Sequence, residues 1–225
     1  MKKRLLIFIA VVSVLLVSCE DFLDRQPMDT LSPSNYWSTP DNALSVLVGC
    51  YDALQQPKNT GYALYDLWGA RDVFTPIGMS RQADFNVIAE GSADPNNSIF
   101  SGTWRGLYKG VVRCNDLLNN IHQVNFSGDT ATQNQIIGEA YFLRALYYYA
   151  LVDYYGDVPL ILNIQSVEES VVPRNPKEEV IDSMLNNLSF AIENLPDSYT
   201  GANIGRATKG AALSLDVKYR MMQKD

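Results

Sequence analysis

Histidine and cysteine are scarce in this chain of 225 residues, which contains one histidine and three cysteines. A zinc site built on imidazole ligands needs more than the single His122, and no two cysteines have the spacing of a metal-binding pair. The sequence therefore predicts no metal site, and His122 is interpreted as a polar residue near a helix end.

The sequence motifs of common enzyme classes are also absent. The chain has no Gly-x-Ser-x-Gly elbow, no His-Glu-x-x-His motif and no phosphate-binding loop. Acidic residues are plentiful, but any chain this acidic offers carboxylate pairs, so they do not indicate a glycosidase. We expect no catalytic residue and no cofactor, and the sequence predicts a protein that is not an enzyme.

Positive charge is in deficit, with 18 Lys and Arg against 25 Asp and Glu and a formal net charge of −7. Nucleic-acid phosphates would be repelled by this balance, and no basic stripe offsets it. No second long apolar run follows the N-terminal one. The sequence thus predicts a body that is tethered to a membrane rather than spanning it, with no nucleic-acid partner.

What the sequence does contain is an N-terminal export signal. The basic start Met1–Arg4 precedes an apolar run over residues 5–17. This run is shorter than the about 20 residues that span a bilayer, and it is typical of a signal peptide. It ends in Leu16-Val17-Ser18-Cys19, which resembles the lipobox of bacterial lipoproteins. The resemblance implies that residues 1–18 are removed and that Cys19 carries diacylglycerol and an N-acyl chain such as palmitate.

Three segments are therefore expected: a lipoprotein signal peptide (1–18), a lipidated tether (19–38) and a helical body (39–225). Loss of three cationic residues with the signal takes the formal charge from −7 to −10. Each buried methylene contributes about 0.8 kcal/mol, so more than one acyl chain makes anchoring stable. The alternatives are an ordinary signal peptide with an incidental cysteine and a plain membrane anchor.

The body is predicted to be all-α because apolar residues recur at helical spacing and no comparable strand pattern occurs. The expected helices run from Pro40 to just before Pro57, over about 97–122, over about 130–155, from Asn175-Pro176 to just before Pro196, and from about Thr208 onward. The last of these is expected to carry its apolar stripe on Ala211, Ala212, Leu215, Val217 and Tyr219.

Several helix ends are marked by capping residues. Thr39 and Asn175 each precede a proline, a pattern typical of an N-cap followed by proline at the first helical position. Gly156 supplies a helix stop. On the second helix, glycines at positions 102, 106 and 110 are spaced to let another backbone approach.

Two features of the body leave alternatives open. Residues 60–95 are rich in Gly, Asp, Asn and aromatic residues, and they predict a long irregular loop region, which in a compact domain is usually functional or disordered. Cys50 and Cys114 fall on apolar helix stripes. They are either bridged, as exported proteins allow, or buried as free thiols.

Two segments of the third helix and its exit carry a family resemblance. Glu139-Ala140-Tyr141-Phe142-Leu143-Arg144-Ala145-Leu146-Tyr147-Tyr148-Tyr149 followed by Tyr155-Gly156-Asp157-Val158-Pro159-Leu160 resembles the hallmark segment of the SusD/RagB family. Supporting stretches are Trp104–Tyr108, Cys114-Asn115, Pro173-Arg174, Gly205–Ala212 and the Asp21–Asp24 run after the lipobox. The resemblance extends through nearly the whole mature chain.

The resemblance implies a body of tetratricopeptide-like helix pairs and a lipid-anchored location on the outer face of the bacterial outer membrane. It implies a partner, a SusC-like TonB-dependent transporter, over which the protein closes as a lid, and oligosaccharides as the usual ligands. Family members are roughly twice as long as this chain. The sequence is therefore interpreted as the N-terminal portion of a SusD-like protein, and much of the family's ligand surface belongs to the other half.

Candidate ligand-binding residues lie in the 60–95 region, which offers aromatic faces and planar polar groups suited to sugars. They are Trp68, Arg71, Asp72, Arg81 and Phe85. By family pattern, Asp72 and Arg81 match a stretch that supplies polar ligand contacts, and Phe85 lies near the position of a stacking Trp. The lack of a Trp at that position leaves room for a peptide ligand.

The same residue types have structural interpretations. Trp68 can be a core residue that pins the loop, and Arg71 and Asp72 can be surface ions of little energetic weight. Trp104 and Tyr147 sit on helical stripes and are interpreted as core residues. Glu139, like Arg144, is interpreted as a structural partner.

The leading hypothesis is a cell-surface lipoprotein that binds oligosaccharide and delivers it to a SusC-like transporter. One alternative is a RagB-like lipoprotein that takes up peptides. Another is a helical-repeat scaffold with no small ligand.

Replacing Cys19 with Ala removes the thiol that lipidation requires, so the variant should no longer fractionate with membranes. Cys50→Ala, which leaves the lipobox intact, is the matched control and should remain in the membrane fraction. Cell fractionation with immunoblotting measures both, and unchanged fractionation of Cys19→Ala would remove the anchor.

Overall fold

A computed structural model of the chain describes residues 36–55, 71–75, 77–78, 83–94, 96–163, 166 and 171–223, and Trp37–Asp225 form one unit. Its helices are η1 (Tyr36–Ser38), α3 (Pro40–Asp52), η2 (Ala53–Gln55), η3 (Arg71–Phe74), α5 (Ala83–Ala89), α6 (Ser98–Asn120), η4 (Ile121–Gln123), α7 (Thr130–Tyr155), α8 (Lys177–Asn194), η6 (Gly201–Asn203) and α9 (Lys209–Met222). Within these ranges the only β pairing is one isolated bridge, between Val158 and Asn175. The all-α prediction is confirmed.

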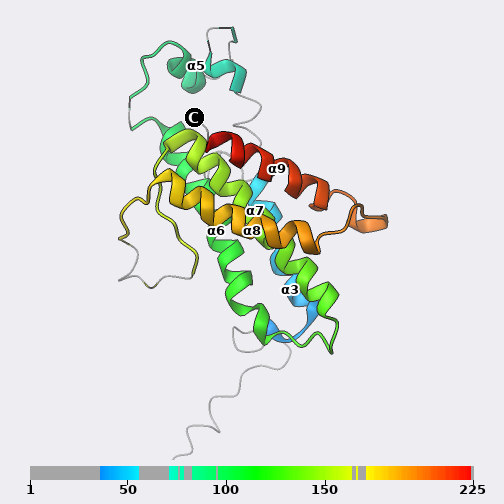
Figure 1. The fold of residues 1–225 in the computed structure, drawn as a ribbon. Helices are drawn as coiled ribbons and strands as arrows, with labels where there is room; N and C mark the ends of the chain where they lie inside the picture. Colours follow the sequence, from blue (N-terminus) through cyan, green and yellow to red (C-terminus); the bar gives the residue numbers. More distant parts are fainter. Residues whose placement is uncertain are drawn as a thin grey trace, which may run out of the picture. The chain divides into compact units, whose positions relative to one another are not determined.

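Helices that follow one another in the chain pack side by side (Figure 1). Helix α7 contacts α6 and α8 along its length, α8 also packs on α9, and α3 lies against both α6 and α7. This succession of helix pairs agrees with the tetratricopeptide-like arrangement that the resemblance implied. None of the described helices is both long enough and apolar enough to cross a bilayer.

Helix α7 is the centre of the hydrophobic core. Residues on every side of it are buried, among them Ile136, Leu143, Tyr147, Tyr148 and Leu151. A helix buried all round needs neighbours on several faces, and α3, α6, α8 and α9 supply them. Each large side chain contributes roughly 1.5–3 kcal/mol when buried, so the many buried residues of α7 contribute strongly to the stability of the unit.

Local capping explains where most helices begin. The Thr39 side chain accepts a hydrogen bond from the Asn42 amide at 3.3 Å, and Pro40 occupies the first helical position, as predicted. Asp129 caps α7 by accepting from the Thr132 amide at 3.0 Å. Gly156 ends α7 with φ of 67°, a value that glycine adopts at no steric cost.

The predicted start of the fourth helix was wrong. Helix α8 begins at Lys177, and Asn175 is not its cap. Asn175 is instead held in an extended bridge to Val158, with backbone hydrogen bonds of 3.2 and 3.0 Å. The cap comes from a distant residue, because the Lys177 amide donates to Asp157 Oδ1 at 3.0 Å.

Two further predictions needed correction. Val217 was placed on the buried stripe of the last helix, but it is 55% exposed, while Ala212, Leu215 and Tyr219 are buried. Helix α9 packs mainly against α8, so its opposite side stays open. The 60–95 region was predicted to be irregular, yet its described residues include the short helices η3 and α5.

The glycine and cysteine positions near α3 and α6 are tightly packed. Cys50 and Cys114 are buried free thiols, and burial together with the neighbouring Cys50 thiol raises the pKa of Cys114.

A Cβ added to Gly110 would overlap the Tyr147 ring. The close approach expected at this glycine is therefore made by a side chain rather than by another backbone, and the Tyr147 hydroxyl continues past it to donate to the Cys50 carbonyl at 2.7 Å.

A buried carboxylate, Glu139 of α7, ties three parts of the chain together. Tyr51 and Tyr199 donate their hydroxyls to it at 2.7 and 2.8 Å. Arg206 donates from Nε and Nη2 at 2.9 and 2.6 Å, which makes a bidentate pair. The Tyr51 hydroxyl also accepts the Ala207 amide at 2.8 Å. Helix α3 and the connection between α8 and α9 are thereby joined to α7.

A buried guanidinium, Arg144, lies one turn further along α7. It donates to Asn115 Oδ1 at 2.8 Å, to Asn187 Oδ1 at 2.7 Å and to the Leu162 carbonyl at 3.2 Å. These acceptors are neutral, and burial lowers the pKa of Arg144. The contacts join α6, α7 and α8, so Arg144 is a structural residue in this arrangement.

Replacing Glu139 with Gln keeps the side-chain shape but removes the charge that Arg206 and two tyrosines require. Loss of one partner of a buried ion pair costs about 3 kcal/mol, so we expect the urea unfolding midpoint to fall markedly. The control, Arg220→Gln, breaks an exposed pair with Asp216 and should not change the midpoint measurably. Equal midpoints for the two variants would contradict the role of Glu139.

Candidate functional site

The described part of the predicted ligand region forms a small layer on the main helices. Helix η3 packs on α5, and α5 contacts the start of α6. Phe85 and Ile99 are buried together, with Phe74 and Ile88 packed around them, and the Phe74 and Phe85 rings lie 5.8 Å apart. These few apolar contacts hold η3 and α5 onto α6.

An ion pair attaches η3 to the C-terminal end of α7. Arg71 Nη2 donates to Asp153 Oδ2 at 2.9 Å, with the two side chains 50% and 23% exposed. A pair this exposed contributes little to stability. It nevertheless orients a planar cationic group at the surface beside Tyr154, and Arg71 partly opposes the rise that burial causes in the Tyr154 pKa.

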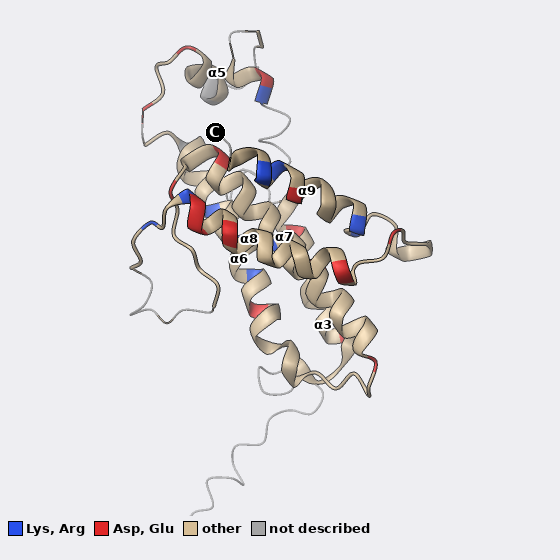
Figure 2. Ribbon diagram, viewed as in Figure 1, with Lys and Arg blue, Asp and Glu red and all other residues tan. Residues whose placement is uncertain are grey.

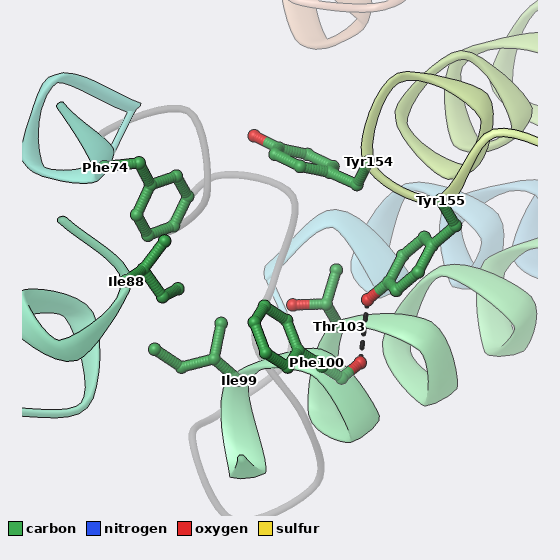
Figure 3. Close-up of a pocket in the computed structure, with 7 residues that line it drawn as sticks. All are labelled: Phe74, Ile88, Ile99, Phe100, Thr103, Tyr154 and Tyr155. Carbon is green, nitrogen blue, oxygen red and sulfur yellow. Dashed lines mark hydrogen bonds between the residues drawn. The ribbon is translucent and has the colours of Figure 1, made fainter. Parts of the chain in front are cut away.

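A pocket of about 100 Å³ lies where these elements meet (Figure 3). Its wall comes from η3, α5, the first turns of α6 and the last turn of α7. The lining residues are Phe74, Ile88, Ile99, Phe100, Thr103, Tyr154 and Tyr155. The pocket is therefore largely apolar, with hydroxyl groups on the side formed by α6 and α7.

Tyr155 gives this pocket a fixed wall. Its hydroxyl donates to the Phe100 carbonyl at 2.7 Å, the bond drawn in Figure 3. Its ring meets Trp104 edge-on at 5.0 Å between centroids, and the Arg174 guanidinium lies 5.1 Å from the Trp104 ring centre. Burial raises the pKa of Tyr155 to about 12, so the phenol stays neutral at physiological pH.

The structure describes three of the five residues that were predicted to bind a ligand. Arg71 and Asp72 lie together in η3 at the surface, whereas Trp68 and Arg81 lie outside the described residues. Phe85 is 5% exposed, so its ring faces other protein side chains. Ligand contact by these five residues stays a prediction.

The core interpretations of two other aromatic residues agree with the structure. Tyr147 is fully buried, and Trp104 is partly buried against the core. Sequence reasoning missed the pocket residues Thr103 and Tyr154. Tyr154 falls near the end of the predicted third helix, and no sequence signal shows that its side chain lines a cavity.

The distribution of charged residues indicates no second candidate binding site on the described helices. Figure 2 shows acidic and basic residues scattered over α6, α7, α8 and α9, with no continuous stripe of either sign along the described helices. The described residues contain no group of three or more His, Cys, Asp or Glu placed to hold a metal ion.

Comparison with known proteins gives one family. Residues 21–218 match the SusD-like family model described as starch-binding and associating with the outer membrane. A SusD-like protein of Bacteroides ovatus is 29% identical over 97% of this chain and 39% of its own length. The SusD-like protein P25 of Formosa agariphila is 26% identical over 92% of this chain and 41% of its own.

Solved structures of SusD-like proteins have a similar fold. A laminarin-binding SusD-like protein superposes with a TM-score of 0.72 at 26% identity, over 83% of this chain and 41% of that one. Surface glycan-binding protein A from Bacteroides uniformis gives a TM-score of 0.69 at 25% identity, over 83% and 42%. The chain thus spans about two fifths of the length of the relatives it matches.

Two tyrosine hydroxyls on α7, those of Tyr148 and Tyr155, predict an alkaline limit to stability. Burial raises the pKa of Tyr148 and of Tyr155 to about 12, against a usual value of 10.0. A raised phenol pKa leaves stability intact below about pH 10 and loses it as pH rises toward 12.

We therefore expect the urea midpoint to fall between about pH 10 and about pH 12, with these phenols ionising as the chain unfolds. Ultraviolet absorbance of phenolate measures this, and Tyr155→Phe should remove one phenol from the late phase. Full phenolate formation near pH 10 in the folded chain would contradict the burial.

Proposed function

Because the chain belongs to the SusD-like family, we propose that it is a cell-surface lipoprotein that binds an oligosaccharide and delivers it to a SusC-like TonB-dependent transporter. The observation that carries this proposal is the family match over residues 21–218. The chain spans about two fifths of its relatives, so the proposal concerns the whole protein to which this portion corresponds.

Glycan binding is supported by two solved relatives that are 25% and 26% identical to this chain. One is a laminarin-binding SusD-like protein and another is a surface glycan-binding protein. The action proposed here is capture and transfer, which requires complementary surfaces and no catalytic group. A binding protein for sugars uses aromatic faces for C–H surfaces and planar polar groups for hydroxyls.

The proposed contact surface is the exposed side of η3. Arg71 presents a guanidinium that is half exposed and already oriented by Asp153, so little side-chain entropy remains to be lost on binding. Asp72 adds an exposed carboxylate on the same turn. Trp68 and Arg81 complete the proposed set, and a stacking face from Phe85 would require its ring to leave the apolar cluster.

The proposed membrane attachment rests on the N-terminal sequence. Residues 1–18 are proposed to be the signal peptide, residues 19–38 the lipidated tether and 39–225 the helical body of a longer protein. Cys19 is the proposed lipidation site. An acyl anchor on the outer membrane would keep the binding surface next to a transporter in the same membrane.

Peptide uptake is the second candidate. The observation that favours it is the burial of Phe85 at 5% exposure, since this position does not offer an open aromatic ring for sugar stacking. A half-exposed arginine beside an aspartate would suit a peptide's carboxylate and amides equally well.

Calorimetry of the full-length protein against a glycan panel, run beside a peptide panel, separates these candidates. We expect saturable binding to a glycan, with laminarin and starch oligosaccharides as first probes, and at least a tenfold weaker affinity for Arg71→Ala, since hydrogen bonds to charged groups contribute about 1.5–3 kcal/mol. The matched control is Arg220→Ala, which removes an exposed arginine on α9 and should bind as the parent does.

Binding to peptides alone would replace the glycan proposal, and no binding in either panel would favour a scaffold. The transporter step has its own measurement: gentle detergent extraction of the native membrane should co-purify a porin-sized partner. Repeated recovery of the protein alone would count against delivery to a transporter.

A further inference from the structure

The fold brings two cysteines together in the helical body. The chain has three cysteines, at positions 19, 50 and 114. Cys19 is the proposed lipidation site, so Cys50 on α3 and Cys114 on α6 are the two that remain. The Cys114 thiol makes a hydrogen bond with the Cys50 thiol, and both side chains are 0% exposed. The two thiols of the body therefore share one enclosed place in the core.

Contacts on the neighbouring residues hold the two thiols in position. Arg113, the residue before Cys114, donates to the carbonyl of Gly49, the residue before Cys50, at 2.6 Å. The same guanidinium donates to Asp52 at 2.8 Å. These bonds fix α3 against α6 without involving either sulfur. A disulfide forms only between cysteines whose side chains are already close and face each other, and the fold supplies that condition here.

A plain packing role does not account for this placement. Buried cysteines often serve as small apolar side chains, but alanine or valine would fill the same volume, and a packing role does not require two cysteines in contact. The body has only these two, on helices that are far apart in the sequence. The predicted export would also carry them into an oxidising compartment, where disulfides form and persist. Contact and compartment together favour a bond over two separate thiols.

We propose that Cys50 and Cys114 form a disulfide bond that joins α3 to α6 when the protein folds outside the cytoplasm. One thiolate attacks the disulfide of a thiol oxidoreductase in that compartment, and the second thiolate then displaces the oxidoreductase from the mixed disulfide. One S–S bond forms in this chain, one is reduced to two thiols in the oxidant, and the two thiol protons pass to those thiols. The inference goes beyond glycan binding and uses the proposed export only to supply the oxidant.

Burial determines when the bond can form. An oxidant needs a thiolate that it can reach, whereas both thiols are fully buried and burial raises the pKa of Cys114 well above its usual value. Oxidation therefore precedes the packing of α3 on α6. The completed bond is then enclosed by the same side chains that bury the two cysteines.

The bond would close a loop that contains the proposed ligand region. Residues 51–113 lie between the two cysteines, and they include η3, α5 and all five proposed ligand-binding residues. A cross-link lowers the conformational entropy of the unfolded chain, more so for a longer loop. Few contacts hold η3 and α5 onto α6. The disulfide would thus fix both ends of a segment that is otherwise lightly attached.

Met79 lies between the two cysteines and allows a direct test. The full-length protein is taken from whichever cell fraction contains it, alkylated in urea to block free thiols, and cleaved after methionine with cyanogen bromide. Cleavage leaves Cys50 in fragment 29–79 and Cys114 in fragment 80–184. Mass spectrometry should find these two fragments joined and unalkylated, and a reductant should separate them.

Fragments that are separate and alkylated before reduction overturn the proposal, and so does a disulfide from either fragment to another peptide. Fractionation of the same sample reports on membrane attachment independently. Separate fragments from a membrane-bound protein overturn this inference and leave the anchor standing. Joined fragments from a protein found away from the membrane support this inference and contradict the anchor.

The variants Cys50→Ala and Cys114→Ala, alone and together, should give separate fragments. The oxidised parent should unfold at a urea concentration about 1 M or more above that of the reduced parent. The double variant is the matched control, because it keeps small apolar side chains at both positions, and a reductant should not shift its midpoint. A parent midpoint that the reductant leaves unchanged would show that no bond joins the two helices, and would overturn the proposal as well.

Discussion

The buried carboxylate of Glu139 is the interaction on which the arrangement of helices depends. A carboxylate without solvent is strongly unfavourable unless donors surround it, and here Tyr51, Tyr199 and both nitrogens of one edge of Arg206 do so. Tyr51 lies on α3, whereas Tyr199 and Arg206 lie in the connection between α8 and α9. Helix α7 therefore cannot bury Glu139 unless α3 and the α8–α9 connection are both held against it. The hydrogen bonds of Glu139 thus determine how these largely apolar helices are assembled.

A fixed α7 explains where a binding site can form. Its C-terminal turn carries Asp153, Tyr154 and Tyr155, and each of these faces the layer made by η3 and α5. That layer is held by a small apolar cluster and one exposed ion pair, so it is the less stable part. The pocket therefore lies between a firmly packed wall from α6 and α7 and a layer that few contacts hold in place.

Sequence reasoning succeeded where the determinants are local. The Thr39-Pro40 start of α3 and the Gly156 stop of α7 depend on capping, which neighbouring residues set. It failed at Asn175, which looks like a cap but pairs with the distant Val158. It also failed at Val217, which is two residues from both Leu215 and Tyr219 and therefore lies on the opposite side of α9 from these buried residues. The pocket could not be predicted because its wall joins η3, α5, α6 and α7, which are far apart in the sequence.

The most direct test of this account is a double-mutant cycle between Glu139 and Arg206, measured as the free energy of unfolding in urea. Substitutions Glu139→Gln and Arg206→Gln, alone and together, should show a coupling of roughly 1–3 kcal/mol, since residues in one buried network are not additive. Additive effects, with the double variant losing the sum of the single losses, would show that the helices assemble without this contact and would contradict the account.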